Sequence, residues 1–257
     1  MPEDSKLLIV SLEGCHGCGK TALCEEFEQQ GYRVLDEAFM DMPSYALHPQ
    51  SLLMETSWVC SWFERVLRLA SRLSHEKNPK YRKQVYIADR SPFSAVFYSA
   101  NGHLLEPVIR EQMREVQAYS NVQFYTANIQ VDPELLWERI LARLEREPER
   151  CRFNEHKRSW MEQTLAFYNN FQWDLNVTND HRSISLIVSN IIATLAERDV
   201  DFREVSERNQ LMLKCSSSFA STDSDDCEST DELVSPAHRS IIAFNNCQED
   251  DTDSDRS

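Results

Sequence analysis

Glycine is scarce in this sequence and concentrated at one place. The chain of 257 residues has five glycines, and three of them, Gly14, Gly17 and Gly19, lie within a single short segment. Glycine lets a backbone adopt positive φ angles and approach a ligand closely. An apolar run at residues 7–12 precedes this segment, and a helical pattern from about residue 20 follows it. The sequence therefore predicts a buried strand, a tight loop and a helix in direct succession.

The loop between them has the pattern G-x-x-x-x-G-K-T, from Gly14 to Thr21. In this context backbone N–H groups and the helix N-terminus surround phosphate groups. We expect Lys20 to balance charge on the β- and γ-phosphates of ATP and Thr21 to offer its hydroxyl to Mg²⁺. The residues expected to bind the nucleotide are Gly14, Cys15, His16, Gly17, Cys18, Gly19, Lys20, Thr21 and Ala22.

Cys15 and Cys18 have a C-x-x-C spacing, which is also typical of metal and redox sites. A zinc site needs four ligands, and no other cysteines have this spacing, while His16 lies between the two thiols rather than after them. A redox dithiol would not need Gly-Lys-Thr beside it. Both observations favour the phosphate loop, and a redox-sensing thiol protein is kept as a rival hypothesis. It predicts that cysteine variants abolish function and that Lys20→Ala does not.

Charge and hydropathy exclude some classes of partner. A net charge of −15 argues against a nucleic-acid-binding surface. The sequence has no apolar run of eighteen residues, so we expect no membrane span, and its N-terminus does not have the pattern of a signal peptide. We therefore expect a cytoplasmic protein.

Short apolar runs alternate with helical patterns over the first 200 residues. This alternation predicts an α/β fold in which helices cover both faces of a parallel sheet. We expect one domain over residues 1–205, with a five-stranded sheet and a helical lid. The predicted strands are 7–12, 32–37, 84–89, 122–131 and 175–178, and the last predicted helix is 182–198.

The C-terminal segment has a different composition. Residues 216–257 contain eleven acidic residues and two arginines, with many serines. Such a segment buries too little apolar surface to fold, so we predict an acidic disordered tail over residues 206–257. An apolar run at 240–244 is either a docking motif for a protein partner or part of a featureless tail.

Charged residues follow two of the predicted strands. Asp36 and Glu37 end the second strand, and Asp89 and Arg90 end the third. In an open parallel sheet ligands bind at the carboxyl ends of the strands. An acidic residue there can bind Mg²⁺ or accept a hydroxyl proton, and an arginine can bind phosphate.

Arginines also line one face of the helix after the fourth strand. Arg139, Arg143 and Arg146 recur at helical spacing before a charged loop at 145–155. Paired with the neighbouring glutamates, they would form a solvated face. Alternatively they belong to a mobile lid that closes over the transferring phosphoryl group.

Together these motifs resemble the P-loop thymidylate kinase and deoxyribonucleoside kinase families. LEG-x-x-G-x-GKT (12–21) is similar to the phosphate loop of both. DRSPFSAVFYSANG (89–102) resembles a thymidylate kinase pattern at Asp89, Arg90, Ser94 and Tyr98. Residues 130–147 and 151–155 are similar to the entry and exit of the lid. The resemblance implies a P-loop NTPase-type three-layer sandwich over residues 6–198.

The resemblance also implies roles. Asp89 and Thr21 would hold Mg²⁺, Lys20 would act on the phosphates, and Arg143 and Arg146 would be lid arginines. Acceptor binding would fall to Phe63, Arg68, Arg90 and Tyr98, although packing in the core is the alternative for Phe63. The segment 36–44 lacks the glycine-rich acceptor motif of thymidylate kinases. Glu37 could instead serve as the base, as in nucleoside kinases.

The sequence therefore predicts Mg-ATP-dependent phosphoryl transfer to a nucleoside monophosphate or a deoxynucleoside. The choice of acceptor stays open, because the glutamine that reads the nucleobase in nucleoside kinases has no match on the helix at 51–77. The alternative is a non-catalytic ATP-binding regulatory protein whose acidic tail binds a protein partner. A homodimer is a further hypothesis.

Overall fold

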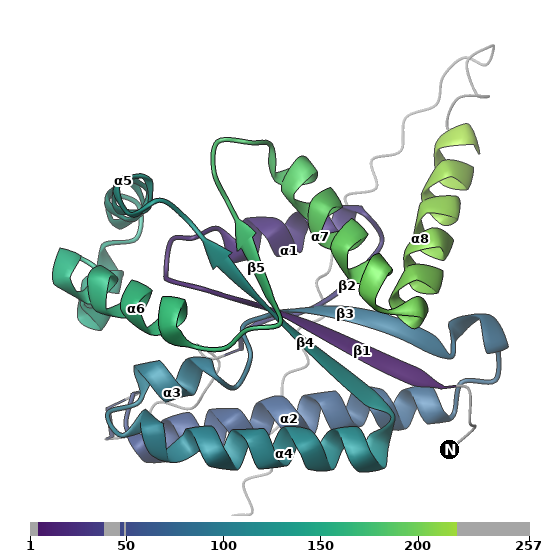
Figure 1. Cartoon of the computed structure of the whole chain (residues 1–257), viewed down its shortest axis with the longest axis horizontal. Coiled ribbons are helices and arrows are strands. Elements are labelled where there is room, and N and C mark those ends of the chain that lie inside the picture. Colours follow the sequence, from purple (N-terminus) through teal and green to yellow (C-terminus); the bar gives the residue numbers. More distant parts are fainter. Residues whose placement is uncertain (1–4, 39–46, 49, 220–257) are drawn as a thin grey trace, which may run out of the picture.

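The core of the protein is a sheet of five parallel strands in the order β2-β3-β1-β4-β5. The computed structural model describes residues 5–38, 47–48 and 50–219 (Figure 1). The predicted parallel α/β sandwich is confirmed. The strands are β1 (Lys6–Glu13), β2 (Arg33–Leu35), β3 (Lys83–Asp89), β4 (Val122–Gln130) and β5 (Leu175–Thr178).

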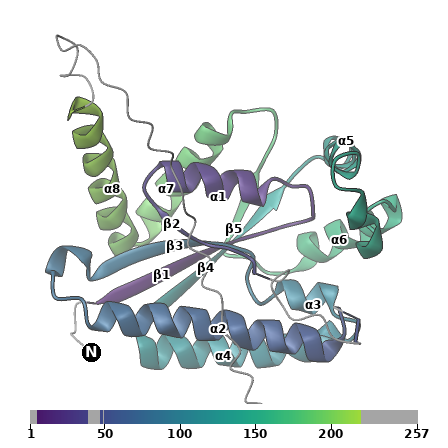
Figure 2. The ribbon, with the colours of Figure 1, turned by 180° about the vertical axis from the view of Figure 1, so that it is seen from behind.

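Helices cover both faces of this sheet. Helices α2 and α4 lie on one face, and α1 and α7 lie on the other with α8 beside them (Figures 1 and 2). Helices α5 and α6 lie beyond one end of the sheet. The helices are α1 (Lys20–Gln29), α2 (Leu52–Ser74), α3 (Ser94–Tyr98), α4 (Leu105–Ser120), α5 (Pro133–Leu144), α6 (Arg158–Asn170), α7 (Ile184–Arg198) and α8 (Val200–Phe219), with 3₁₀ turns η1 (Pro79–Tyr81), η2 (Gly102–Leu104) and η3 (Pro148–Phe153).

Strand β1 lies at the centre of the sheet and is buried on both faces. Leu8 and Val10 belong to the core under α1 and α7, whereas Leu7 and Ile9 belong to the core under α2 and α4. Side chains alternate along a strand, so a strand covered on both sides must be apolar at nearly every position. Because β1 runs parallel to β3 and β4, the loop that follows it lies at the carboxyl ends of these strands.

Helix α8 was not predicted from the sequence. The sequence predicts a last helix over 182–198 and a tail from residue 206, but α8 continues through that position to Phe219. The Asp199 carboxylate accepts hydrogen bonds from the backbone N–H groups of residues 201 and 202 and so caps this helix. Phe202 and Val205 are buried in the core. The first half of α8 is otherwise mostly polar, so the sequence shows no clear apolar stripe at helical spacing there.

The boundary between the domain and the tail stays a prediction. Residues 220–257, including the apolar run at 240–244, lie outside the described residues. Within the described part of the chain, no helix combines the length and apolar character that a membrane span requires.

Candidate functional site

The loop between β1 and α1 adopts a conformation that glycine alone allows. Gly14 and Gly19 have φ angles of 139° and 95°. A Cβ atom at Gly14 would lie 2.7 Å from the Ile129 carbonyl oxygen, and one at Gly19 would lie 2.6 Å from the Asn179 amide nitrogen. The glycines therefore let the loop pack against the ends of β4 and β5 while its backbone curls over the start of α1.

Lys20, the first residue of α1, is folded back onto this loop. Its buried Nζ donates hydrogen bonds to the carbonyl oxygens of Gly14 at 2.9 Å and Cys15 at 3.1 Å. The ammonium group thus lies against the concave side of the loop, where a phosphate group would need a positive charge. Ala22 is exposed in the first turn of the same helix.

Thr21 and Asp89 meet at the carboxyl edge of the sheet. The Thr21 hydroxyl donates a hydrogen bond of 2.9 Å to Asp89 Oδ2. The described residues contain no cluster of three or more His, Cys, Asp or Glu side chains that could hold a metal alone. Mg²⁺ in nucleotide sites typically takes one or two protein oxygens together with phosphate oxygens and water. This pair fits such a Mg²⁺ ion.

Two side chains of the loop, Cys15 and His16, are buried and uncharged. Burial and the nearby Lys20 lower the pKa of His16 to about 3, so its imidazole is neutral. Burial, with Cys18 beside it, raises the pKa of the Cys15 thiol to about 12. The cysteines of the described residues are free thiols. A protonated buried thiol is a poor nucleophile, which weighs against the redox hypothesis.

A buried carboxylate, Glu13, organises the residues after β3. Its Oε1 accepts hydrogen bonds from the Ser91 backbone N–H at 2.7 Å and the Ser91 hydroxyl at 2.6 Å. Its Oε2 accepts from the Ser94 hydroxyl at 2.9 Å and the Tyr168 hydroxyl at 3.0 Å. Glu13 is not among the site residues that the sequence motifs predict. Its position directly before Gly14, at the end of a buried strand, was the available signal.

Arg90 and Glu37 form an ion pair beside this network. Arg90 Nε lies 2.8 Å from Glu37 Oε1, and the Arg90 side chain is 11% exposed. Its guanidinium also lies over the ring of Tyr98, 5.1 Å from the centroid. Arg90 has a φ of 77°, in the left-handed region that non-glycine residues rarely adopt. These contacts hold that conformation and orient Glu37.

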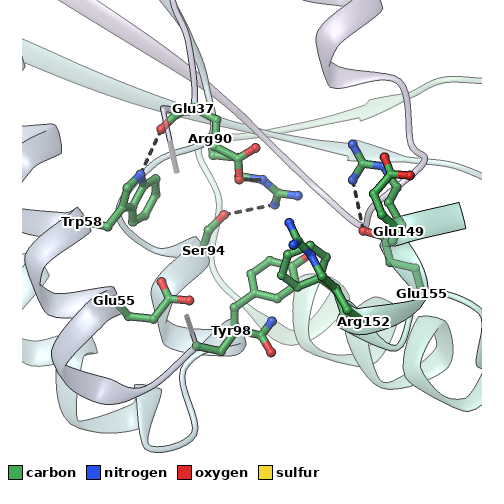
Figure 3. A pocket seen from close by; sticks show the side chains of 12 residues that line it. Glu37, Glu55, Trp58, Arg90, Ser94, Tyr98, Glu149, Arg152 and Glu155 are labelled. Atoms are coloured by element: carbon green, nitrogen blue, oxygen red, sulfur yellow. Dashed lines mark hydrogen bonds and ion pairs between the residues drawn. The ribbon is translucent and has the colours of Figure 1, made fainter. Parts of the chain in front are cut away.

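These residues line a pocket of about 150 Å³ (Figure 3). Tyr98 and Ser94 reach it from α3, Glu55 and Trp58 from α2, and the charged residues of η3 line it as well. The Trp58 Nε1 donates a hydrogen bond of 2.9 Å to the Glu37 carbonyl oxygen. The lining residues are Glu37, Gln50, Glu55, Trp58, Arg90, Ser94, Tyr98, Glu149, Arg150, Arg152, Phe153 and Glu155.

Besides Arg90, the arginines that line the pocket come from the 3₁₀ turn η3 rather than from α5. Arg150 pairs with Glu147 and Glu155, and Arg152 lines the pocket beside it. Arg143 pairs with Glu147 at 3.2 Å, and Arg146 is exposed and donates a hydrogen bond to the Ala142 carbonyl oxygen. Neither lines the pocket. Because α5 ends at Leu144, the helical spacing that relates Arg139, Arg143 and Arg146 does not extend to the residues of η3 that line the pocket.

Two predicted acceptor residues lie away from the pocket. Phe63 is buried in the core with Trp62 and Phe124. Arg68 is 61% exposed and pairs with Glu64. Arg68 lies ten residues beyond Trp58, which is about 15 Å along a helix axis. An acceptor-binding role for Phe63 and Arg68 therefore has no support in this arrangement, and Trp58 is the aromatic residue of α2 that lines the pocket.

Comparison with known proteins shows one family. A model of the AAA domain matches residues 9–171, which include the glycine loop, the Arg90 segment and η3. No curated protein matches the chain.

Solved structures resemble the chain only at low identity. Deoxyadenosine kinase from M. mycoides, with dCMP and dCDP bound, is 14% identical with a TM-score of 0.46, over 74% of this chain and 99% of that one. The YorR protein from Bacillus subtilis, in complex with phosphorylated GDP, is 14% identical with a TM-score of 0.42, over 73% and 95%. An uncharacterized protein from Eubacterium ventriosum is 10% identical with a TM-score of 0.40, over 75% and 99%.

Proposed function

We propose that this chain, which belongs to the AAA domain family, transfers the γ-phosphoryl group of Mg-ATP to the hydroxyl of a nucleoside. The observation that carries this proposal is the position of the two halves of the site. The glycine loop with Lys20 and the Thr21–Asp89 pair stand on one side, and the Glu37–Arg90 pair opens into a pocket on the other. Asp89 and Arg90 are adjacent in sequence, so the end of β3 contributes Asp89 to the first half of the site and Arg90 to the second.

The glycine loop would bind the phosphates of ATP. Its backbone N–H groups and Lys20 offer positive charge to the phosphoryl oxygens. Thr21 and Asp89 would hold Mg²⁺, which neutralises charge on the β- and γ-phosphates when it is bound. Because Lys20 is already held by two loop carbonyls, it need not be ordered when the nucleotide arrives.

Glu37 is the base in this proposal. Its carboxylate would accept the proton of the attacking hydroxyl as the oxygen of that hydroxyl bonds to phosphorus. Arg90 keeps the Glu37 carboxylate in place through their ion pair. The Glu37 side chain is 40% exposed, so a substrate hydroxyl can reach it.

The charges of the pocket favour a nucleoside over a nucleoside monophosphate. Arg90 forms an ion pair with Glu37, and Arg150 forms ion pairs with Glu147 and Glu155. Of the described lining residues, Arg152 is the one cation without an ion pair, and a bound monophosphate would lie near the carboxylates of Glu37, Glu149 and Glu155. A neutral acceptor avoids this repulsion.

The 3₁₀ turn η3 acts as the lid. It carries Arg150 and Arg152 over the pocket and follows α5, which packs against the glycine loop through Ile140. Closure would exclude water, so that the phosphoryl group passes to the acceptor and not to water.

The experiment that tests the proposal measures ADP release from Mg-ATP with a panel of nucleosides and monophosphates. We expect a nucleoside to stimulate release by the wild type and not by Lys20→Ala. Lys77→Ala is the matched control, because Lys77 is exposed and outside the site. If no acceptor stimulates ADP release, the kinase proposal is wrong.

Two rivals predict other results in the same assay. A non-catalytic ATP-binding regulatory protein would bind ATP with no acceptor-dependent release. A redox-sensing protein would lose function in Cys15→Ser and Cys18→Ser and keep it in Lys20→Ala. A homodimer and a protein partner of the acidic tail stay predictions.

A further inference from the structure

Glu55 is a buried acidic residue in the acceptor pocket that the proposed reaction does not use. It lies on α2, one turn before Trp58, and is 3% exposed. It reaches into the pocket between Trp58 and Tyr98 (Figure 3). Helix α2 packs on the sheet through Trp62 and Val66, so the face that carries Glu55 is fixed by the core.

The surroundings of Glu55 disfavour a negative charge. No described residue donates a hydrogen bond to its carboxyl group, and Arg90, the cation whose charge acts on it, is already paired with Glu37. A buried carboxylate that lacks a partner pays a large desolvation cost and takes up a proton instead. Burial accordingly raises the pKa of Glu55 to about 8, with Arg90 opposing this shift and Glu37 adding to it.

A neutral carboxyl group offers one O–H donor beside one carbonyl acceptor. The edge of a nucleobase presents the complementary pair, a ring nitrogen or carbonyl acceptor beside an N–H donor. The aromatic rings of Trp58 and Tyr98 line the same pocket and can bury the flat faces of such a ring.

We propose that Glu55, as a neutral acid, recognises the nucleobase of the acceptor through a pair of hydrogen bonds. This inference rests on the proposed function and adds a specificity-determining residue to it. The acceptor class is a nucleoside whose base has a hydrogen-bond donor next to an acceptor. Glu37 remains the general base that accepts the proton of the attacking hydroxyl, so the carboxyl groups of Glu37 and Glu55 have different roles.

The proposal makes acceptor binding depend on pH. Below about pH 8 Glu55 is protonated and can donate its O–H; above this value it ionises and loses the donor. The KM for the acceptor should therefore rise as pH increases from 7 to 9.5. The other titratable and charged groups facing the pocket are Glu37, Arg90, Tyr98, Glu149, Arg150, Arg152 and Glu155.

The kinetic test compares Glu55→Gln with Glu55→Ala. Glutamine keeps a neutral donor–acceptor pair, so we expect its KM at pH 7 within about threefold of the wild type, with no rise at high pH. Alanine removes both hydrogen bonds, so the KM should increase about tenfold or more, with a smaller change in kcat. Glu64→Gln is the matched control on the exposed side of α2 and should behave as the wild type. A Glu55→Gln variant that loses kcat at unchanged KM would show an ionised catalytic carboxylate and overturn the proposal.

A second measurement does not depend on turnover. The infrared difference spectrum between the wild type and Glu55→Gln should contain the C=O band of a protonated carboxyl group at pH 7, which disappears by pH 9.5. A carboxylate band at pH 7 would overturn the inference even if the protein is a kinase. A protonated band in a protein that no acceptor stimulates would leave the charge assignment standing and refute the proposed function, and with it the nucleobase role.

Discussion

Glu37 Oε1 and Arg90 Nε lie 2.8 Å apart, and this ion pair joins the ends of β2 and β3 at the pocket that Glu55, Trp58 and Tyr98 also line. The neighbouring contacts all support it: Trp58 holds the Glu37 backbone, and Ser94 and Tyr168 lie within hydrogen-bonding distance of the Arg90 guanidinium. We infer that the pair is held in place before substrate binds, so that little reorganisation is needed during the reaction.

The first prediction concerns this pair. Glu37→Gln keeps the shape of the side chain but removes its ability to accept a proton, so kcat should fall by about 10²–10⁴-fold. ATP binding, measured by calorimetry, should not change, because Glu37 lies on the acceptor side. Asp36→Asn, the neighbouring acid paired with Arg65, is the control. Equal effects of both variants on kcat would contradict the assignment of the base.

The second prediction concerns Glu13. Its carboxylate accepts four hydrogen bonds in a site with no exposure to water. Glu13→Gln replaces one accepting oxygen with a donating NH₂ group, and at least one hydroxyl loses its acceptor. We expect the free energy of unfolding, measured with urea, to decrease by about 1–3 kcal/mol. Exposed Glu28→Gln should have no such effect, and an unchanged unfolding midpoint in Glu13→Gln would refute this role.

The third prediction concerns magnesium. Asp89→Asn keeps a hydrogen-bond partner for Thr21 but removes the negative charge that the cation needs. The Mg²⁺ concentration for half-maximal ADP release should rise by about tenfold or more. Binding of ATP in the presence of EDTA should change little or improve, because the variant removes an anion near the phosphates. An unchanged Mg²⁺ dependence would exclude Asp89 from the metal site.

The fourth prediction concerns pH and His16. The folded protein keeps His16 neutral to about pH 3, whereas an unfolded histidine takes up a proton near pH 6.5. The stability that depends on neutral His16 is therefore present above pH 6.5 and is lost as the pH falls towards 3. Between pH 7.5 and 5 the wild type should lose more free energy of unfolding than His16→Gln does. Equal losses in the two proteins would contradict a buried neutral imidazole.

Local motifs allowed the glycine loop, Lys20 and the strand end at Asp89 to be located from the sequence. Each of them is marked by a few consecutive residues, and Lys20 Nζ bonds carbonyl oxygens only six and five residues away. The predicted sheet is correct for the same reason, because buried strands such as residues 7–12 have a strong apolar signal.

The pocket beside Glu37 and Arg90 could not be predicted in the same way. Whether Glu55 and Trp58, rather than Phe63, face the pocket depends on how α2 is rotated against the sheet. Glu13 bonds Ser91 and Tyr168, which are 78 and 155 residues away. Such partners are brought together by the fold and leave no local pattern. The end of α5 at Leu144 likewise decides which arginines reach the pocket.

The central claim is that the protein phosphorylates a nucleoside, and the direct test is to identify the product. Each nucleoside and each monophosphate is incubated with Mg-ATP and the wild type or Lys20→Ala, and the products are determined by mass spectrometry. The account predicts that a nucleoside monophosphate accumulates with the wild type and not with Lys20→Ala. Conversion of monophosphates to diphosphates with no reaction of any nucleoside would contradict it.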